Sequence, residues 1–139
     1  MSNYSKTNAT GESVQVEQSL VKVVSTTSAL SINDSGSIIA VATDAIVITL
    51  PATKAGVEYT FINTGADGNN IITISPQSTD GISGVITLAG TVVARAGTVN
   101  VDLVNTKATS KIGSTVTIIG TGVAGVTAWV IKGSTGIWA

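Results

Sequence analysis

The stretch AIVITLPATKAGVEYTFIN, residues 45–63, decides the fold class of this chain. Within it, residues 46–50 place Ile or Leu at every second position, which is the two-residue period of a half-buried β-strand. Pro51 has no N–H group to donate to a strand ladder, so the strand is expected to end there. The alternation resumes over residues 57–61, where Val, Tyr and Phe share one face. The stretch therefore predicts two strands, joined by a segment with room for one helical turn at most.

The same alternation of apolar and polar residues recurs through the rest of the chain from Leu20 onward. Alternating apolar runs such as GSIIAVA, IITIS, TVNVDLVN and STVTIIG follow one another at roughly 8–12-residue spacing, with turn residues between them. No segment has the sustained period of a helix, and no fixed-length repeat indicates a solenoid. The sequence therefore predicts an all-β fold for residues 20–139: a single β-sandwich or jelly-roll-like domain of about eight to ten short antiparallel strands.

Residues 1–19 differ from this domain, because they are rich in Ser, Asn, Thr and Glu and contain few apolar side chains. They show no basic region followed by an apolar one, so we do not expect a signal peptide. A segment this polar buries too little apolar surface to offset the conformational entropy that it loses when it becomes ordered. We therefore expect an extended N-terminal arm that becomes ordered on a partner. Tyr4, Val14 and Val16 are its candidate contacts, since an extended arm places such side chains in grooves or adds a strand to a neighbouring sheet.

The composition indicates assembly. Hydrophobic residues make up 43% of the chain and charged residues 11%, against about 25% charged in an ordinary soluble domain. No run approaches the ~18 consecutive apolar residues of a membrane helix, so we expect no membrane partner and apolar surface buried in the fold or against other subunits. The sequence therefore predicts a permanent homo-oligomer. The seven Lys and Arg residues are dispersed and the net charge is -1, which argues against nucleic acid as a partner.

The chain lacks both histidine and cysteine. This removes the usual general bases and thiolate nucleophiles, and the acidic residues are dispersed, so we expect no enzyme. The oxygens of Asp67, Asn69, Asn70 and Asp80 suit calcium by type, but their spacing matches no EF-hand loop. Asp-Gly and Asn-rich segments form turns for backbone reasons alone. We therefore expect no metal and no other cofactor.

One motif matches a nucleotide-binding pattern. Gly120, Gly122 and Gly125 follow the β run at residues 115–119 and satisfy G-x-G-x-x-G. In a dinucleotide fold this pattern opens a helix, whereas the residues that follow here, VTAWVIKG, are typical of a strand. We therefore expect a Gly-rich hairpin between two late strands.

Four of the five aromatic residues are expected in the core or at an oligomer interface. Tyr59, Phe61 and Trp129 lie within strand patterns. Trp138 is expected to dock on this subunit or on a neighbour, because an exposed tryptophan in a tail is costly. A sugar-stacking platform built from such rings is the alternative that the sequence leaves open.

Residues 29–84 carry a series of short motifs. A Ser/Gly turn precedes the strand ITLP at 48–51, and an Ala-Gly turn at 55–56, an aromatic strand YTF at 59–61 and ITI at 72–74 follow. This succession resembles small bacteriophage virion β-proteins of the capsid decoration (cement) and head-fibre type.

The resemblance implies a β-sandwich subunit, commonly trimeric, that is made in the host cytoplasm and becomes part of the virion. Its partner would be the major capsid protein, with the arm residues Tyr4, Val14 and Val16 contacting the outer shell. The chain has neither the long repeats nor the large receptor-binding head of fibre proteins, which favours decoration of the capsid over host recognition. We therefore expect a structural protein that decorates and stabilises a phage capsid as an oligomer.

Two other functions remain open. A receptor- or glycan-binding module of a fibre or appendage would use Trp138 or loop residues such as Asp67 and Asn69. An ice-binding or surface-layer protein would use Thr-x-Thr at residues 115–117, but the sequence lacks the regular threonine array that such a surface needs.

Overall fold

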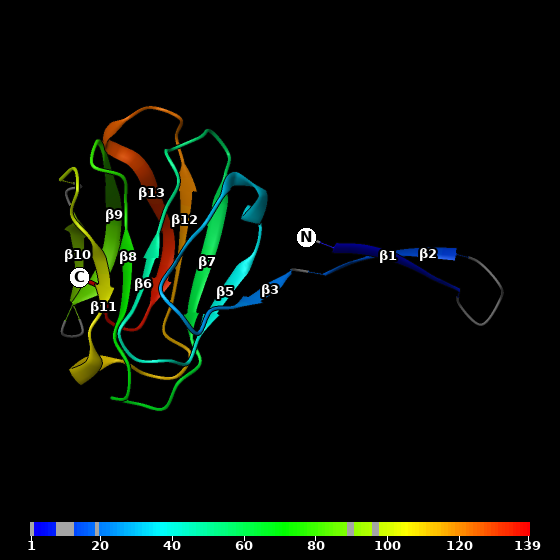
Figure 1. The fold of residues 1–139 in the computed structure, drawn as a ribbon, viewed down its shortest axis with the longest axis horizontal. Coiled ribbons are helices and arrows are strands. Elements are labelled where there is room, and N and C mark those ends of the chain that lie inside the picture. The colour runs from blue at the N-terminus through cyan, green and yellow to red at the C-terminus, as the bar shows by residue number, and fades with distance from the viewer. Residues whose placement is uncertain (1, 8–12, 19, 89–90, 96–97) are drawn as a thin grey trace.

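The computed structural model describes residues 2–7, 13–18, 20–88, 91–95 and 98–139. Its strands form two sheets and one separate hairpin, so the all-β class is confirmed (Figure 1). The helical segments of the described residues are two single turns, η1 (Ile32–Asp34) and η2 (Lys107–Thr109). Neither turn is long or apolar enough to cross a membrane.

The larger sheet has seven strands and the smaller sheet has four. In spatial order, the larger sheet contains β10 (Thr91–Arg95), β9 (Asp80–Leu88), β13 (Gly125–Thr135), β12 (Thr115–Gly120), β7 (Glu58–Asn63), β5 (Ile38–Val41) and β3 (Val21–Val23). The smaller sheet contains β11 (Leu103–Asn105), β8 (Ile72–Ser75), β6 (Ile46–Thr49) and β4 (Ser28–Ala29), and the hairpin contains β1 (Ser2–Thr7) and β2 (Ser13–Gln18). With seven and four strands, the two sheets exceed the eight to ten strands expected, and the segment 20–29 contributes two short ones, β3 and β4.

From β3 to β8 the chain alternates between the two sheets. β3, β5 and β7 join the larger sheet, and β4, β6 and β8 join the smaller one. Successive strands of one sheet therefore run in the same direction. In the larger sheet, Val21 pairs with Ile38 and Ile38 pairs with Thr60, both in parallel ladders. Ile48 pairs in parallel with Ile74 across β6 and β8. Parallel neighbours need a crossover connection, and here the crossover is a strand of the facing sheet.

The expectation of antiparallel strands throughout is therefore wrong for this part of the molecule. Alternation along a strand identifies its two faces, but it carries no information on the direction of the neighbouring strand. The later strands pair mostly in antiparallel fashion: β12 with β7 and β13, β9 with β10, and β11 with β8. Among the described pairs of these later strands, β9 and β13 alone are parallel.

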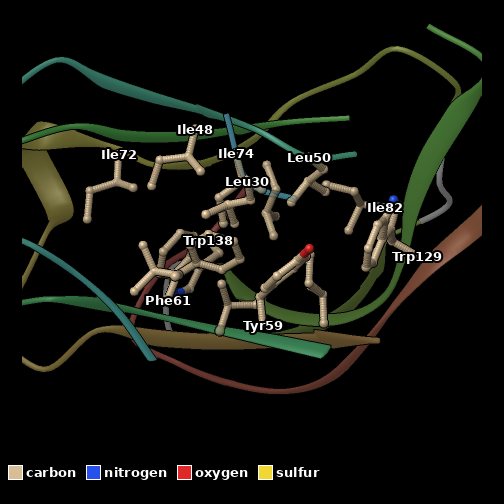
Figure 2. Packing of buried hydrophobic residues seen from close by; sticks show 14 of the residues in the cluster. Leu30, Ile48, Leu50, Tyr59, Phe61, Ile72, Ile74, Ile82, Trp129 and Trp138 are labelled. Atoms are coloured by element: carbon tan, nitrogen blue, oxygen red, sulfur yellow. The ribbon is translucent and has the colours of Figure 1, made fainter. Parts of the chain in front are cut away.

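The buried side chains lie between the two sheets (Figure 2). Ile72 and Ile74 come from the smaller sheet and face Tyr59 and Phe61 of the larger one. The ring centroid of Tyr59 lies 6.3 Å from that of Phe61 and 5.7 Å from that of Trp129, within the range of favourable aromatic contacts. All five side chains are fully buried. Their burial stabilises the fold at roughly 25 cal/mol per Å² of apolar surface removed from water.

The residues after β13 close this core. The indole of Trp138 is fully buried and belongs to the same core cluster as Phe61 (Figure 2). Its Nε1–H donates to the carbonyl oxygen of Thr135 at 3.1 Å, which satisfies the polar group of the ring. The backbone groups of Ala139 and Val104 then bond to each other at 2.7 and 2.9 Å. The last residue is thereby fixed to strand β11 of the smaller sheet.

The glycines of the G-x-G-x-x-G motif connect β12 to β13, so the expected Gly-rich hairpin is confirmed. A Cβ atom on Gly120 would lie 2.4 Å from the carbonyl oxygen of Lys54, and Gly122 has a φ of +81°. The first position therefore needs a residue without a side chain, and the second needs the left-handed conformation that glycine adopts freely. Both allow the hairpin to pack against the turn that precedes β7.

The N-terminal segment forms a hairpin of its own. β1 and β2 pair in antiparallel register, with Tyr4 opposite Val16 and Lys6 opposite Val14. Figure 1 shows this hairpin beyond β3, apart from the two sheets. The extended arm expected over residues 1–19 is thus two paired strands in its described part, because a chain that folds back satisfies its own backbone groups. The role of Tyr4, Val14 and Val16 in contacting a capsid stays a prediction.

Candidate interaction surface

The acidic residues considered for a calcium site do not meet. Asp67 lies in the loop before β8, where its carboxylate accepts the Ile112 N–H at 2.9 Å and pairs with Lys111 at 3.4 Å. Asp80 begins β9, beyond the other end of β8, and its carboxylate accepts the Thr53 N–H at 2.9 Å. Within the described residues, no three His, Cys, Asp or Glu side chains gather to hold a metal. Both carboxylates instead anchor backbone from distant segments.

The two asparagines of the same loop differ in exposure. Asn69 is exposed, whereas Asn70 is fully buried. A Cβ atom on Gly65 would lie 2.5 Å from Oδ1 of Asn70, so the glycine makes room for this amide. Asn70 therefore fills the interior of the loop and does not present its oxygen to a ligand at the surface.

Carboxylates tie together the loops at the end of the molecule where β7 ends and β8 begins. Asp44 accepts the Ile71 N–H at 2.9 Å and pairs with Lys107. The hydrogen bond from Lys107 lowers the pKa of Asp44, and the bond from the Ile112 N–H lowers the pKa of Asp67. These acids are therefore ionised at neutral pH, and their charges are paired within the chain. The arrangement holds the loops to one another.

The aromatic residues expected in the core or at an interface are all fully buried: Tyr59, Phe61, Trp129 and Trp138. Figure 2 shows them between the two sheets. A sugar-stacking platform therefore cannot include any of these four rings. The glycan-binding alternative loses Trp138 and keeps only the loop residues Asp67 and Asn69.

The surface of the larger sheet that points away from the core presents mostly uncharged side chains in regular rows. Strand register brings one row together as Val23, Ala40, Ile62, Thr115 and Thr135, and the next as Val21, Ile38, Thr60, Thr117 and Gly133. Their neighbours along the strands, such as Phe61 and Ile118, are fully buried in the core. We call this surface the outer face.

Hydroxyl groups on the outer face bond to one another. The Oγ1 atoms of Thr60 and Thr117 lie 2.9 Å apart, and those of Thr115 and Thr135 lie 2.7 Å apart. Hydroxyls that already have a partner within the chain lose less when water is removed from them. Paired in this way, the threonines do not form the free array on which the ice-binding alternative depends.

One ion pair lies on the outer face. Nζ of Lys132 donates to Oε1 of Glu58 at 2.9 Å. The other three ion pairs of the described residues lie beside β3 and in the loops at the end of the molecule. An exposed pair of this kind stabilises a fold by about 0–1 kcal/mol. Its main consequence is that the outer face carries one charge of each sign and no net charge.

The edge of the outer face is apolar and hollowed. Val21 and Val23 on the edge strand β3 are 55% and 73% exposed. Beside them, a shallow hollow is lined by Ile38, Glu58 and Thr60, together with the turns that precede β5 and β7. Exposed apolar residues next to an open strand edge form the kind of surface that proteins cover by association.

The outward surface of the smaller sheet differs from the outer face. Strand register places Ala29, Val47, Thr49, Thr73 and Ser75 on it. All but Ala29 are half-buried, and no large hydrophobic residue among the described strands of this sheet is exposed. The smaller sheet therefore lacks the exposed valines that favour association at the edge of the larger sheet.

Sequence reasoning did not single out the outer face. Alternation predicted that Glu58 and its second neighbour Thr60 share one side of a strand, but not that five strands from distant parts of the chain lie side by side there. Neither a scan against protein-family models nor a search of the curated proteins found a match to this chain. The function is therefore inferred from the geometry of the chain and from the motifs of residues 29–84.

Proposed function

We propose that this chain is a structural virion protein that decorates a phage capsid and stabilises it as a homo-oligomer, with three as the expected number of subunits. The observation that carries the proposal is the outer face, which has exposed valines at its edge and no net charge. Such a surface favours burial against protein over exposure to water. The virion part of the proposal comes from the motifs of residues 29–84, which resemble capsid decoration and head-fibre proteins.

We also assign the fold to the β-sandwich class, because one core lies between two facing sheets. The jelly-roll form is less favoured, since its Greek keys consist of antiparallel strands and β3 to β8 pair in parallel. In a sandwich of this kind, the buried core between the two sheets stabilises the fold. Its two outward surfaces are then available for contacts with other proteins.

The proposed mechanism is binding without catalysis, cofactor, nucleic acid or membrane. A ligand that binds only the assembled shell stabilises the shell by its binding free energy, about 2.7 kcal/mol per site at a concentration of 100 times Kd. The partner is the major capsid protein, and the hairpin with Tyr4, Val14 and Val16 is the proposed contact. The protein would be made in the host cytoplasm and would act on the capsid surface.

Cosedimentation with purified particles of the phage that encodes the chain tests this function. We expect saturable binding and a higher melting temperature of the decorated particles. Deletion of residues 2–18 should leave the sheets folded and weaken particle binding by orders of magnitude. Equal binding by the deletion variant would show that the attachment surface lies on the sheets and not on the hairpin. Absence of particle binding together with binding on a glycan array would replace the proposal with the receptor-binding alternative.

A further inference from the structure

The edge strand β3 has an open side. It pairs with β5 in a parallel ladder, and the flanking C=O of Leu20 and N–H of Val24 also bond to β5. Successive residues of a strand direct their backbone groups to alternate sides, so the N–H and C=O groups of Val21 and Val23 point away from β5. Among the described residues, none bonds to these outward groups. Unpaired groups at a sheet edge form a template for another strand.

The chain itself does not cover this edge. At the edge of the smaller sheet, the backbone of Ala139 bonds to Val104 of β11. Along β3, by contrast, a single residue separates Gln18, where β2 ends, from Leu20, whose C=O is already bonded to β5. Even the tightest hairpin needs two residues to reverse direction, so β2 continues away from the sheet (Figure 1). The open side of β3 is therefore left for another molecule.

The side chains of this edge suit a neutral, apolar strand. Val21 and Val23 are both exposed, and they lie on the outer face. A lysine on an edge strand commonly keeps sheets apart. Here Nζ of Lys22 lies 3.2 Å from the carboxylate of Asp34 in the same subunit, so β3 and its surroundings present no net charge to a second strand.

A second copy of β3 is such a strand, and its backbone groups match in one register. When two copies run antiparallel about a twofold axis at Lys22, Val21 of each copy stands opposite Val23 of the other. The N–H of each valine then meets the C=O of the valine opposite, so all the outward groups of both strands are paired. The valine side chains meet in cross-strand pairs on one face, which stabilises a sheet. The edge is therefore complementary to itself.

We propose that copies of this chain associate by antiparallel pairing of β3 with β3 about a twofold axis, which joins two of the larger sheets into one continuous sheet. The inference goes beyond the proposed function and does not depend on particle binding. A twofold contact gives an even number of subunits, either a dimer or two trimers joined in pairs.

Val23→Lys and Val123→Lys form a matched pair for the test. Both valines are strongly exposed, the first on β3 and the second in the loop between β12 and β13. Sedimentation equilibrium of the full chain at micromolar concentration measures mass and affinity, and circular dichroism checks that the β structure is kept. In Val23→Lys each pair would bring two ammonium groups into its row of valines. We expect self-association at least about tenfold weaker, with half the wild-type mass at low concentration, and an unchanged oligomer in Val123→Lys.

Val23→Pro tests the backbone contact. It removes an N–H that points away from β5, so the ladder within the subunit keeps its bonds. Pairing with a second copy loses a donor and meets the proline ring. We expect Val23→Pro to have half the wild-type mass. Val23→Thr keeps the N–H and the β-branched shape, and it should sediment as the wild type does.

Two double variants test the register, and they keep the test valid if Val23→Pro fails to fold. In the proposed pairing, residue 21 of each copy stands opposite residue 23 of the other. Val21→Lys with Val23→Glu therefore places opposite charges across the contact, whereas Val21→Lys with Val23→Lys places like charges there. We expect the first double variant to associate at least about tenfold more tightly than the second, with the difference reduced by salt.

Four results would overturn this inference. They are a wild type with an odd number of subunits, wild-type affinity in Val23→Lys or Val23→Pro, equal dissociation in Val123→Lys, and equal affinity of the two double variants. A monomeric wild type that loses particle binding in Val23→Lys would assign the edge to the capsid protein. If the masses change as expected but neither the wild type nor any variant binds particles, the proposed function fails and the strand pairing stands.

Discussion

The two halves of the molecule, residues 20–75 and 80–139, build the same pair of sheets in different ways. In the first half each strand is followed by a strand of the facing sheet, so both sheets grow together in parallel ladders. In the second half, sequence neighbours pair directly, as in β9–β10 and β12–β13. Direct hairpins depend on local contacts, whereas alternating strands depend on contacts across the core. The first half therefore has no stable sheet without its core.

The halves are joined at three kinds of contact. β12 of the second half pairs with β7 of the first, which makes the larger sheet continuous. Trp138 enters the core cluster that contains Phe61 and the other buried residues of the first half (Figure 2). At the end of the molecule where Asp44 and Asp67 anchor the loops, the side chain of Asn63 in β7 donates to the side chain of Asn105 in β11 at 3.0 Å. Both residues are fully buried. We therefore expect one cooperative unfolding transition for both halves, and the following variants test this.

Trp138→Ala should have the largest effect. The change removes a fully buried indole from the contact between the halves and leaves a cavity, at an expected cost of about 3–5 kcal/mol in the free energy of unfolding. Urea unfolding, followed by circular dichroism and by the fluorescence of Trp129, measures it. Trp138→Phe is the control and should lose less, because most of the ring volume stays. Separate transitions for the two probes would show that the halves unfold independently.

Asn105→Ala should have the next largest effect. Its side chain accepts from Nδ2 of Asn63 and donates to the carbonyl oxygen of Ile137 at 2.8 Å. Removal leaves a buried donor and a part-buried acceptor without partners, for an expected loss of about 1–3 kcal/mol in unfolding free energy. Asn69→Ala, at an exposed position, is the control and should unfold like the wild type. Equal stability of both variants would contradict a role for this buried link.

Tyr59→Phe tests a contact made within the first half alone. The hydroxyl donates to the carbonyl oxygen of Ser31 at 2.6 Å, so its loss should cost about 0.5–1.5 kcal/mol. Burial raises the pKa of Tyr59 to about 12 from 10.0, which favours the neutral phenol in the folded state. That stabilisation is complete below the unfolded value and is lost as the pH rises from about 10 to 12. Urea unfolding across this range should show a smaller alkaline loss in the variant, and equal losses would contradict the assignment.

Asp67→Asn should have the smallest effect, on the link between the loop before β8 and Ile112. The bond from the Ile112 N–H lowers the pKa of Asp67 below 3.8, so the stabilisation is present above 3.8 and is lost as the pH falls through the lowered value. The carboxylate is exposed, so added salt should reduce its pairing with Lys111. Thermal unfolding in acid should show a shallower decline for the variant than for the wild type. A decline of the same steepness would assign the acid sensitivity to other carboxylates.

The local elements were the most predictable part of the fold. The strands β5, β6, β7 and β8 all lie within the runs that alternation identified, and β6 ends two residues before Pro51. The Gly-rich hairpin after residue 119 was also predicted, because strand residues follow its glycines where a nucleotide fold needs a helix. Such features depend on neighbours in the sequence, so the sequence displays them directly.

The candidate surface was less predictable. Tyr59 and Phe61 were identified as interior or interface residues, and only the structure distinguishes the two by burying both rings. The relation of Thr117 to Thr60 and to Gly133 depends on the pairing of β12 with β7 and β13. No short window of the sequence contains these pairs, so no pattern in it could have marked the outer face.

The sequence by itself determined where most of the strands lie and which of their side chains share a face, because a strand's two-residue period is set by its own backbone. The tertiary structure decided the rest. It placed each strand in one of two sheets, gave β3 to β8 their parallel direction, and buried Trp138 between them. These choices depend on contacts between residues far apart in the chain, whose free energy is gained only when both sheets close over one core.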